Sequence, residues 1–252
     1  MIDFDNVSFS YGTRHVLKNV SFSIDALERV AILGGSGEGK TTILKLIVGL
    51  LKPDAGRIVI DGVDITDQTE DELRSTRMKM SIVFQEGALF DSLTVKENVA
   101  FCLREYTTLS EEEINQKVRG LLRMVGMEDA IDLMPEELSG GMHRRAAIVR
   151  SMAAFEPEMF LYDEPTAGLD PINADNICRL ILELSKNGKG FVIITHKITD
   201  ALKVANRFIF LKDGVILFDG GKEPLLRSTI SDLRAFMSEL TFDARSSSVA
   251  GT

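Results

Sequence analysis

Residues 33–42 read LGGSGEGKTT, a glycine-rich stretch that lies between two apolar runs. The run before it, Arg29–Leu33, is short and apolar, which is typical of a buried strand. After it, apolar residues recur at helical spacing from Ile43 to Leu50, and Pro53 ends this predicted helix. A strand, a glycine loop and a helix in this order predict a loop that wraps an anion at the helix N-terminus.

The loop follows the spacing Gly-x4-Gly-Lys-Thr, from Gly34 to Thr41, which is the pattern of a phosphate-binding P-loop. Glycines allow backbone N–H groups to point at phosphates, Lys40 supplies positive charge to the β- and γ-phosphates, and Thr41 offers a hydroxyl to Mg²⁺. The alternative is a glycine-rich turn with a solvated lysine, which the strand–loop–helix context disfavours. We therefore predict a nucleotide site formed by Gly34, Gly35, Ser36, Gly37, Glu38, Gly39, Lys40, Thr41 and Thr42.

Two carboxylates follow another apolar run, Met159–Tyr162, at the point where a predicted strand ends. Ligands bind at the carboxyl edge of such sheets, so Asp163 is placed to order a magnesium shell and Glu164 to orient the attacking water. Two acids after a strand are by themselves more often a solvated turn, but a P-loop in the same sheet favours the catalytic interpretation. Gln85 and His196 also close predicted strands, where the amide could sense the metal and the imidazole could bind the γ-phosphate. Each of these two residues is equally compatible with a cap or a turn.

A second helix start in the chain also suits an anion. Residues 138–142 read LSGGM and open an apolar helical pattern, so free N–H groups and partial positive charge gather at Ser139, Gly140 and Gly141. Alone, such a pattern usually marks only a helix cap. Tyr11, after the first predicted strand, is equally compatible with stacking on adenine and with an ordinary strand-end aromatic.

The rest of the chain alternates between strand and helix patterns, except for a mostly helical stretch from about Gln85 to Arg150. Predicted strands are Ile2–Phe9, Val20–Ile24, Arg29–Leu33, Arg57–Ile60, Ser81–Phe84, Met159–Tyr162, Phe191–Ile194, Arg207–Leu211 and Gly214–Asp219. Predicted helices beyond the first are Val95–Leu103, Glu111–Val125, Met142–Ala154, Ile177–Leu184 and a weak amphipathic one around Leu233–Leu240. This alternation indicates an α/β protein with a mainly parallel sheet that a helical lobe interrupts.

Composition excludes several classes of protein. The 252 residues carry a formal net charge of −9, which argues against a nucleic-acid binder and against direct adsorption to anionic lipid. No apolar run approaches the roughly 18 residues of a membrane span, and the acidic start lacks the features of a signal peptide. Cys102 and Cys178 lie in apolar segments without metal-binding spacing, so we expect buried free thiols in a reducing, cytoplasmic compartment.

Taken in chain order, these residues resemble the motifs of the ABC-type ATPase subunits. The counterparts are the A-loop at Tyr11, Walker A at 34–42, the Q-loop at Gln85, the signature at 138–141, Walker B at 162–164, the D-loop at 167–170 and the H-loop at His196. The resemblance implies an α/β fold, with a RecA-like P-loop NTPase core, an N-terminal antiparallel β subdomain and an inserted helical subdomain. It implies an ATP-binding core at 1–84 and 151–225, a helical signature subdomain at 85–150 and a C-terminal tail at 226–252.

The resemblance also implies an ATPase that works as a head-to-tail homodimer, with each nucleotide between the P-loop of one protomer and the signature of the other. Both phosphate-suited loops would then hold the same nucleotide. Implied catalytic residues are Lys40, Gln85, Glu164 and His196, and implied Mg²⁺ ligands are Thr41, Gln85 and Asp163. Implied ATP-binding residues outside the P-loop are Tyr11, Ser139, Gly140, Gly141 and Asp170.

A finer resemblance points to one branch of the family. Residues 85–95, 98–100 and 134–145 are similar to those of ATPases that partner MCE-domain proteins, the Mla type, which moves phospholipids between the membranes of Gram-negative bacteria. It implies an integral membrane permease, an MCE-domain lipid-binding protein and a small STAS-type subunit as partners. It places the chain on the cytoplasmic face of the inner membrane, in contact with the membrane only through the permease. Two alternatives stay open: the ATPase of a small-molecule importer or exporter, and a soluble ABC ATPase outside transport.

Two residues depart from the usual ABC pattern. Most signatures have Gln where this chain has Met142, which cannot hydrogen-bond to a ribose. Glu38 places a carboxylate inside the P-loop, and we expect its side chain to point to solvent, because a carboxylate that faces phosphate would weaken ATP binding. In the tail, the amphipathic stretch at 233–240 is expected either to cap the core or to pack on the second protomer.

Overall fold

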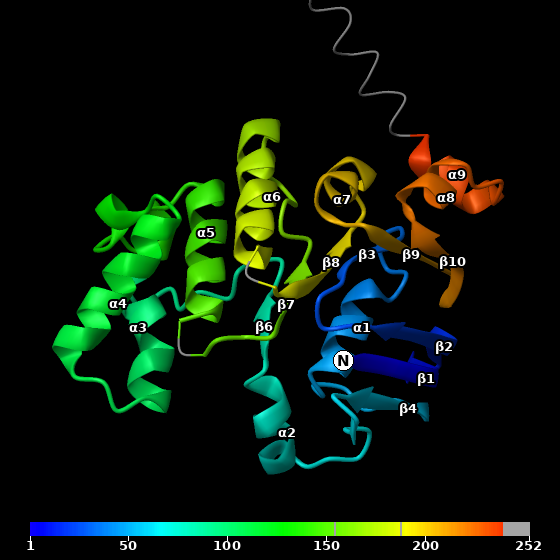
Figure 1. Cartoon of the computed structure of the whole chain (residues 1–252), viewed down its shortest axis with the longest axis horizontal. Coiled ribbons are helices and arrows are strands. Elements are labelled where there is room, and N and C mark those ends of the chain that lie inside the picture. Colours follow the sequence, from blue (N-terminus) through cyan, green and yellow to red (C-terminus); the bar gives the residue numbers. More distant parts are fainter. Residues whose placement is uncertain (154, 187, 239–252) are drawn as a thin grey trace, which may run out of the picture. The chain divides into compact units, whose positions relative to one another are not determined.

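The computed structural model describes residues 1–153, 155–186 and 188–238, and the chain divides into two compact units. The first unit comprises Met1–Arg77 together with the chain from Gly190 onwards, and the second comprises Met78–Lys189 (Figure 1). The boundaries between these units, at 77/78 and 189/190, differ from the domain boundaries expected at 84/85 and 150/151, which stay a prediction. Residues 239–252 of the predicted tail lie outside the described residues.

An antiparallel sheet in the first unit has the strand order β2-β1-β4-β5. Its strands are β1 (Ile2–Tyr11), β2 (Arg14–Ile24), β4 (Ala55–Ile60) and β5 (Val63–Asp64). Buried and exposed side chains alternate along much of β1 and β2, and Phe4 stacks on Phe22 with ring centroids 4.6 Å apart. β2 begins well before the predicted Val20, because its first residues pair with β1 in a hairpin that joins Tyr11 to Arg14.

The strand before the P-loop, β3 (Arg29–Leu33), lies between two parallel neighbours, β8 (Gly190–Thr195) and β9 (Arg207–Lys212). β10 (Val215–Gly221) runs antiparallel to β9 at the edge (Figure 1). β3 and β8 are almost wholly buried, which explains their unbroken apolar sequences. The unit also contains α1 (Lys40–Ile47), α7 (Ile198–Val204), α8 (Lys222–Leu226) and α9 (Ser231–Met237). Because β3 and β8 are parallel neighbours, their carboxyl ends lie side by side, and the chain leaves β3 there toward α1.

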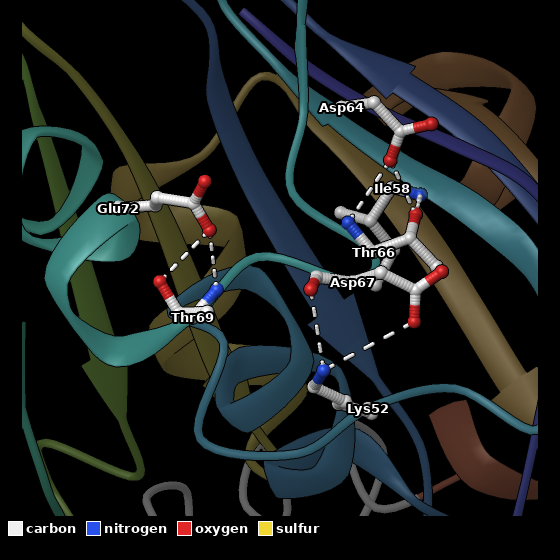
Figure 2. Close-up of polar contacts among 7 residues, drawn as sticks. All are labelled: Lys52, Ile58, Asp64, Thr66, Asp67, Thr69 and Glu72. Atoms are coloured by element: carbon white, nitrogen blue, oxygen red, sulfur yellow. Dashed lines mark hydrogen bonds and ion pairs between the residues drawn. The ribbon is translucent and has the colours of Figure 1, made fainter.

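The sequence pattern does not predict α2 (Glu70–Arg77), because almost all of its residues are charged or polar. A side-chain contact marks its start: the Glu72 carboxylate accepts hydrogen bonds from the N–H and the hydroxyl of Thr69, both at 2.8 Å (Figure 2). Just upstream, Thr66 donates its N–H and its hydroxyl to Asp64 (Figure 2). The Thr-x-x-Glu spacing is the sequence sign of a helix start, so this helix has a signal that apolar periodicity alone misses.

The second unit pairs β6 (Met80–Val83) in parallel with β7 (Met159–Asp163) and carries the predicted helical lobe. Its helices are α3 (Val95–Tyr106), α4 (Glu111–Met124), α5 (Gly140–Ser151) and α6 (Pro171–Ser185), with 3-10 turns at Glu128–Ala130 and Pro135–Glu137. Thr94 and Ser110 start α3 and α4 with capping boxes. The apolar faces of α3, α4 and α5 meet in one buried cluster, so the lobe has a hydrophobic core of its own.

Two further expectations concern thiols and membrane spans. No disulfide joins Cys102 and Cys178; the second is buried in α6, and the first is half-buried in α3, where burial raises the pKa of its thiol. Within the described residues, no helix has the length and apolar character that crossing a membrane requires.

The amphipathic stretch near the C-terminus packs on the first unit as far as it is described. Leu233 of α9 is fully buried, and the ring of Phe236 lies 5.2 Å from that of Phe210 in β9. The described part of this stretch therefore caps the core of the first unit. Leu240 lies outside the described residues.

Asn98 in α3 is a buried polar side chain that organises the loop before its own helix. It is 0% exposed, and its amide oxygen accepts a hydrogen bond from the Phe90 N–H at 2.8 Å. Its amide nitrogen donates to the carbonyl groups of Phe90, Leu93 and Thr94, at 3.1, 2.9 and 3.1 Å. One fully buried side chain thus holds the backbone at Phe90, Leu93 and Thr94 against the start of α3.

We expect Asn98→Ala to lower the free energy of unfolding by about 2–4 kcal/mol, because four hydrogen bonds are lost and the Phe90 N–H and the Leu93 carbonyl lose the partner that the structure gives them. Asn115→Ala in α4 is the matched control, since the Asn115 side-chain oxygen has no hydrogen-bond partner among the described residues. We expect the control to change stability by less than about 0.5 kcal/mol. Urea unfolding measures both variants, and equal midpoints would contradict the role given to Asn98.

Candidate functional site

The P-loop joins β3 to α1 and is held at both ends by close backbone packing. A side chain at Gly34 would put its Cβ 2.5 Å from the carbonyl oxygen of Leu211 in β9. Gly39, the residue before α1, has a left-handed backbone with φ 103°, and a Cβ there would lie 2.8 Å from a methyl group of Val16. Both glycines are therefore required by the fold as well as by the phosphate chemistry that the sequence predicts.

Lys40 is bent over its own loop. It is 6% exposed, and its ammonium donates hydrogen bonds to the carbonyl groups of Gly34 at 2.9 Å and Gly35 at 2.8 Å. The first turn of α1 contains no acidic residue, so no side chain within that turn offsets the partial positive charge of the helix start. A positive charge and a set of N–H groups thus converge on one loop, which is the arrangement that binds phosphate.

Glu38 does not point to solvent, so that expectation is wrong. Its side chain is only 14% exposed, and its two oxygens accept hydrogen bonds from Lys212 Nζ and from the Asp213 N–H, each at 2.7 Å. The reason is tertiary: the turn between β9 and β10 supplies an ammonium and a backbone donor that replace water around the carboxylate. The residue keeps its place in the P-loop while its charge is neutralised.

The structure brings three of the predicted site elements together in the first unit. Tyr11, 48% exposed, ends β1, and its hairpin partner Arg14 donates to the P-loop carbonyl of Gly37 at 3.1 Å. Leu33 pairs with Thr195 in the parallel register, so His196 leaves β8 beside the start of the P-loop. The hairpin, the P-loop and the histidine therefore share one edge of this unit.

In the second unit, β6 and β7 carry the remaining strand-end residues to one edge. Val83 pairs with Tyr162, so Gln85 and the two acids lie at neighbouring strand ends, with Asp163 as the last residue of β7. Asp163 is 3% exposed and Glu164 is 8% exposed. Glu164 has φ 47°, a left-handed backbone that costs a non-glycine residue about 1 kcal/mol or more. Such strain in a buried carboxylate is typical of functional sites.

Arg144 is a site residue to which sequence analysis assigns no role. It lies in α5, is 8% exposed, and donates to the carbonyl groups of Phe84 at 3.2 Å, of Gln85, and of Ala167 at 3.5 Å. Burial lowers the pKa of Arg144, and the negative charge of Asp163 opposes that shift. One guanidinium thus ties the signature helix to the segments around Gln85 and Ala167. A basic residue on the apolar face of α5 is the signal that could have found it.

The signature residues form the start of α5, as the sequence predicts. Ser139 is the N-cap, and its hydroxyl accepts the Met142 N–H at 3.3 Å. A side chain at Gly141 would put its Cβ 2.6 Å from the amide oxygen of Asn173 in α6, so a larger residue there requires the Asn173 side chain to move. Ser139 and Gly140 are exposed, whereas Met142 packs against the hydrophobic cluster of the lobe.

Asp170 caps α6 beside the signature helix. Its carboxylate accepts hydrogen bonds from the N–H groups of Asn173 and Ile172, both at 3.0 Å, and from the Asn173 side chain at 2.5 Å. Hydrogen bonds from Asn173 lower the pKa of Asp170. The ATP-binding role predicted for Asp170 stays a prediction.

A family model described as ABC transporter matches residues 17–167. The intermembrane phospholipid transport ATP-binding protein MlaF of Escherichia coli K12 is 39% identical over 238 residues, which cover 94% of this chain and 88% of MlaF. The chain belongs to the ABC transporter family. The glutamine transport ATP-binding protein GlnQ of the same organism is 38% identical over 242 residues, covering 96% of this chain and 100% of GlnQ. The solved dimer of the ATP-binding cassette MJ0796 with ADP and Pi matches with a TM-score of 0.81 at 36% identity, covering 88% of this chain and 98% of that one.

Membership of the ABC transporter family confirms the predicted fold class, the ABC nucleotide-binding domain. This chain is the ATPase subunit of an ABC transporter, and it binds and hydrolyses ATP. The identities with MlaF and GlnQ are nearly equal, so they do not decide the transported substrate. The roles of single residues stay predictions.

We expect Arg144→Met to lower kcat for ATP hydrolysis about tenfold, a barrier change of about 1.4 kcal/mol, because the carbonyl groups of Phe84 and Gln85 lose their donor. Nucleotide affinity should stay within about twofold, because the hydrogen bonds that Arg144 makes lie on Phe84, Gln85 and Ala167, outside the segment proposed to hold the phosphates. Arg123→Met is the matched control, since Arg123 is an exposed arginine whose ion pair with Glu128 lies at the surface of the helical lobe. Steady-state turnover and nucleotide titration separate the two effects, and an unchanged kcat for Arg144→Met would contradict the role.

Proposed function

We propose that this ABC ATPase binds one nucleotide with the P-loop of one protomer and the signature of a second copy. The P-loop amides and Lys40 would hold the phosphates, and Tyr11 would stack on the adenine. His196 supports this assignment because it leaves the sheet beside the P-loop. The exposed N-terminus of α5, which carries no acid in its first turn, suits the same phosphates from the other protomer. The dimer of MJ0796 with ADP and Pi supports this arrangement.

Magnesium fits the donors that the sequence assigns to it. The hydroxyl of Thr41, the amide oxygen of Gln85 and the carboxylate of Asp163 are hard oxygen ligands, which Mg²⁺ prefers. Among the described residues there is no cluster of three or more His, Cys, Asp or Glu that could hold a metal alone. That absence suits Mg²⁺, which is usually held by few protein groups together with the phosphates. When bound, the ion would neutralise charge on the transferring phosphoryl group.

The protein groups would divide the work of hydrolysis between them. Glu164 would orient the attacking water and accept its proton, which its burial and its constrained backbone favour. Lys40 would stabilise the charge on the β- and γ-phosphates, and His196 would hold the γ-phosphate in line. Gln85 would report the presence of the γ-phosphate to the helical lobe, because Arg144 joins its carbonyl to α5.

We propose that the transported substrate is phospholipid and that the permease docks on an aromatic surface of the second unit. Phe90 and Phe101 are 39% and 42% exposed, their rings lie 4.8 Å apart, and Arg150 stacks 4.5 Å above the Phe90 ring. Exposed aromatic residues beside arginine are typical of protein interfaces. The segment at 85–95, which contains Phe90, also carries the Mla-type resemblance. MCE-domain and STAS-type partners follow from the same proposal, as does a peripheral place on the inner membrane.

A second candidate substrate is a small polar solute such as an amino acid. The observation in its favour is the match to GlnQ, which covers all of that protein. The resemblance of residues 85–95 and Met142 to the phospholipid branch favours the first candidate.

We expect Glu164→Gln to bind ATP with near-normal affinity and to lose at least about 100-fold in turnover, because the water loses its orienting carboxylate. Lys40→Ala should instead weaken nucleotide binding about tenfold or more, because it removes the charge at the phosphates. Lys45→Ala, a second lysine in α1 outside the loop, is the control for Lys40. Nucleotide titration and phosphate release measure both steps. Normal turnover in Glu164→Gln would refute the assignment of the water-orienting residue.

We expect the intact membrane complex that contains this chain to carry phospholipid, which mass spectrometry of the purified complex identifies. Its ATPase rate should change when phospholipid is added in detergent, and should not respond to amino acids. Phe90→Ser with Phe101→Ser should reduce recovery of the permease with this chain while leaving the ATPase rate of the isolated chain unchanged. A complex without lipid that responds to glutamine would establish the second candidate instead.

A further inference from the structure

Glu38 joins the middle of the P-loop to the turn between β9 and β10. Asp213 and Gly214 form this turn with φ values of 50° and 80°, a two-residue hairpin of the kind that favours Asp-Gly. The Asp213 N–H donates to one oxygen of Glu38, and the ammonium of Lys212 donates to the other. The carboxylate is thus bound at both oxygens while it stays in the loop.

The same turn also packs against the strand that supports the end of the P-loop. The Lys18 N–H in β2 donates to the Gly214 carbonyl at 2.8 Å, and a Cβ at Gly214 would lie 2.6 Å from the Val16 carbonyl oxygen. Val16 is also the residue whose side chain packs against Gly39. At the start of the loop, the backbone of Leu211, one residue before Lys212, fills the space where a side chain at Gly34 would lie. The P-loop is therefore fixed at its start, middle and end by β2 and the β9–β10 turn.

The contact between Glu38 and Lys212 also neutralises a negative charge in the P-loop. A carboxylate within the P-loop would repel nucleotide phosphates unless a positive charge neutralises it. Lys212 lies 2.7 Å from Glu38 and 3.7 Å from Asp213. The hydrogen bond to Glu38 is the main cause that raises the pKa of Lys212, and the charges of Asp213 and Asp232 add to it, so the ammonium stays charged.

We propose that Glu38 and Lys212 form a positioning pair that pre-organises the P-loop for ATP. The pair rests on the proposed role of residues 34–42 in phosphate binding. Glu38 anchors the loop so that its N–H groups need little ordering when the nucleotide binds. Lys212 acts through Glu38: it holds the carboxylate on the turn and cancels its charge, and does not itself bind phosphate.

These two roles predict how KM for ATP ranks among variants of Lys212 and Glu38. Lys212→Ala should raise KM for ATP most, about tenfold, because the anchor is lost and the carboxylate is left uncompensated beside the phosphates. Glu38→Ala should raise KM only about threefold, because the anchor and the repelling charge leave together. The double variant should match Glu38→Ala, so the second substitution rescues the first. The kcat at saturating ATP should stay within about twofold throughout, because the groups around Glu164 are untouched.

The experiment measures KM and kcat for these three variants, with nucleotide affinity titrated separately and thermal unfolding recorded for each. Asp67→Ala is the control for removing an acid that pairs with a lysine elsewhere in the first unit. Its carboxylate is 95% exposed, 4.0 Å from Lys52 (Figure 2), and its loss should leave KM unchanged. If Glu38→Ala folds poorly, the nearly isosteric Glu38→Gln in the Lys212→Ala background tests the same rescue.

Rescue of Lys212→Ala by a second substitution at Glu38 supports the positioning pair. A double variant with a higher KM for ATP than Lys212→Ala would overturn it and would make Lys212 a direct phosphate ligand. Unchanged KM in all variants, or losses confined to kcat, would also overturn it. Lys40→Ala separates this outcome from a failure of the proposed function: normal nucleotide binding in that variant would remove the P-loop role itself.

Discussion

The proposed nucleotide site depends on one packing constraint, the absence of space around Gly34 and Gly39 of the P-loop. The Leu211 carbonyl lies where a side chain at Gly34 would go, and Val16 lies where a side chain at Gly39 would go. The loop is therefore clamped between β2 and the end of β9, which limits the conformations that its backbone can adopt. Binding then needs little ordering of the backbone, which is how a short loop can hold a highly charged ligand.

Each unit uses one charged side chain to tie a site loop to a rigid element. In the first unit Glu38 does so through the turn after β9, and in the second Arg144 does so through the backbone around Gln85. Both charges are largely removed from water and both are matched by several partners, which makes the contacts directional. The contacts of Glu38 and Arg144 thus restrict the movement of the P-loop and of the segment around Gln85.

Much of this could be predicted from the sequence because it is local. The bounds of β3, Arg29–Leu33, agree with the apolar run, and Ser139 caps α5 as its position before two glycines indicates. The place of His196 follows from parallel register once β3 and β8 are known to be neighbours. Residues adjacent in sequence or in sheet register leave a pattern that can be recognised.

The remaining features depend on contacts between distant segments. The partners of Glu38 lie far along the chain, so its charge alone suggested exposure, and only the turn after β9 reverses that expectation. Arg144 acts through backbone carbonyl groups, so the residue types of its partners do not reveal the contact, and only its own place on the buried face of α5 gives a signal. β2 begins earlier than its apolar run because hairpin pairing with β1 extends a strand that is partly exposed.

In the proposed dimer, the P-loop of one copy and the signature of the other enclose one ATP. Hydrogen exchange on the Glu164→Gln chain, with and without Mg-ATP, tests it most directly, because hydrolysis is suppressed and backbone amides are read one segment at a time. We predict protection of residues 34–42 at any protein concentration, and of residues 139–142 only at concentrations that allow a dimer. Exchange at 34–42 that ATP does not slow, or protection of 139–142 in the monomer, would contradict the account.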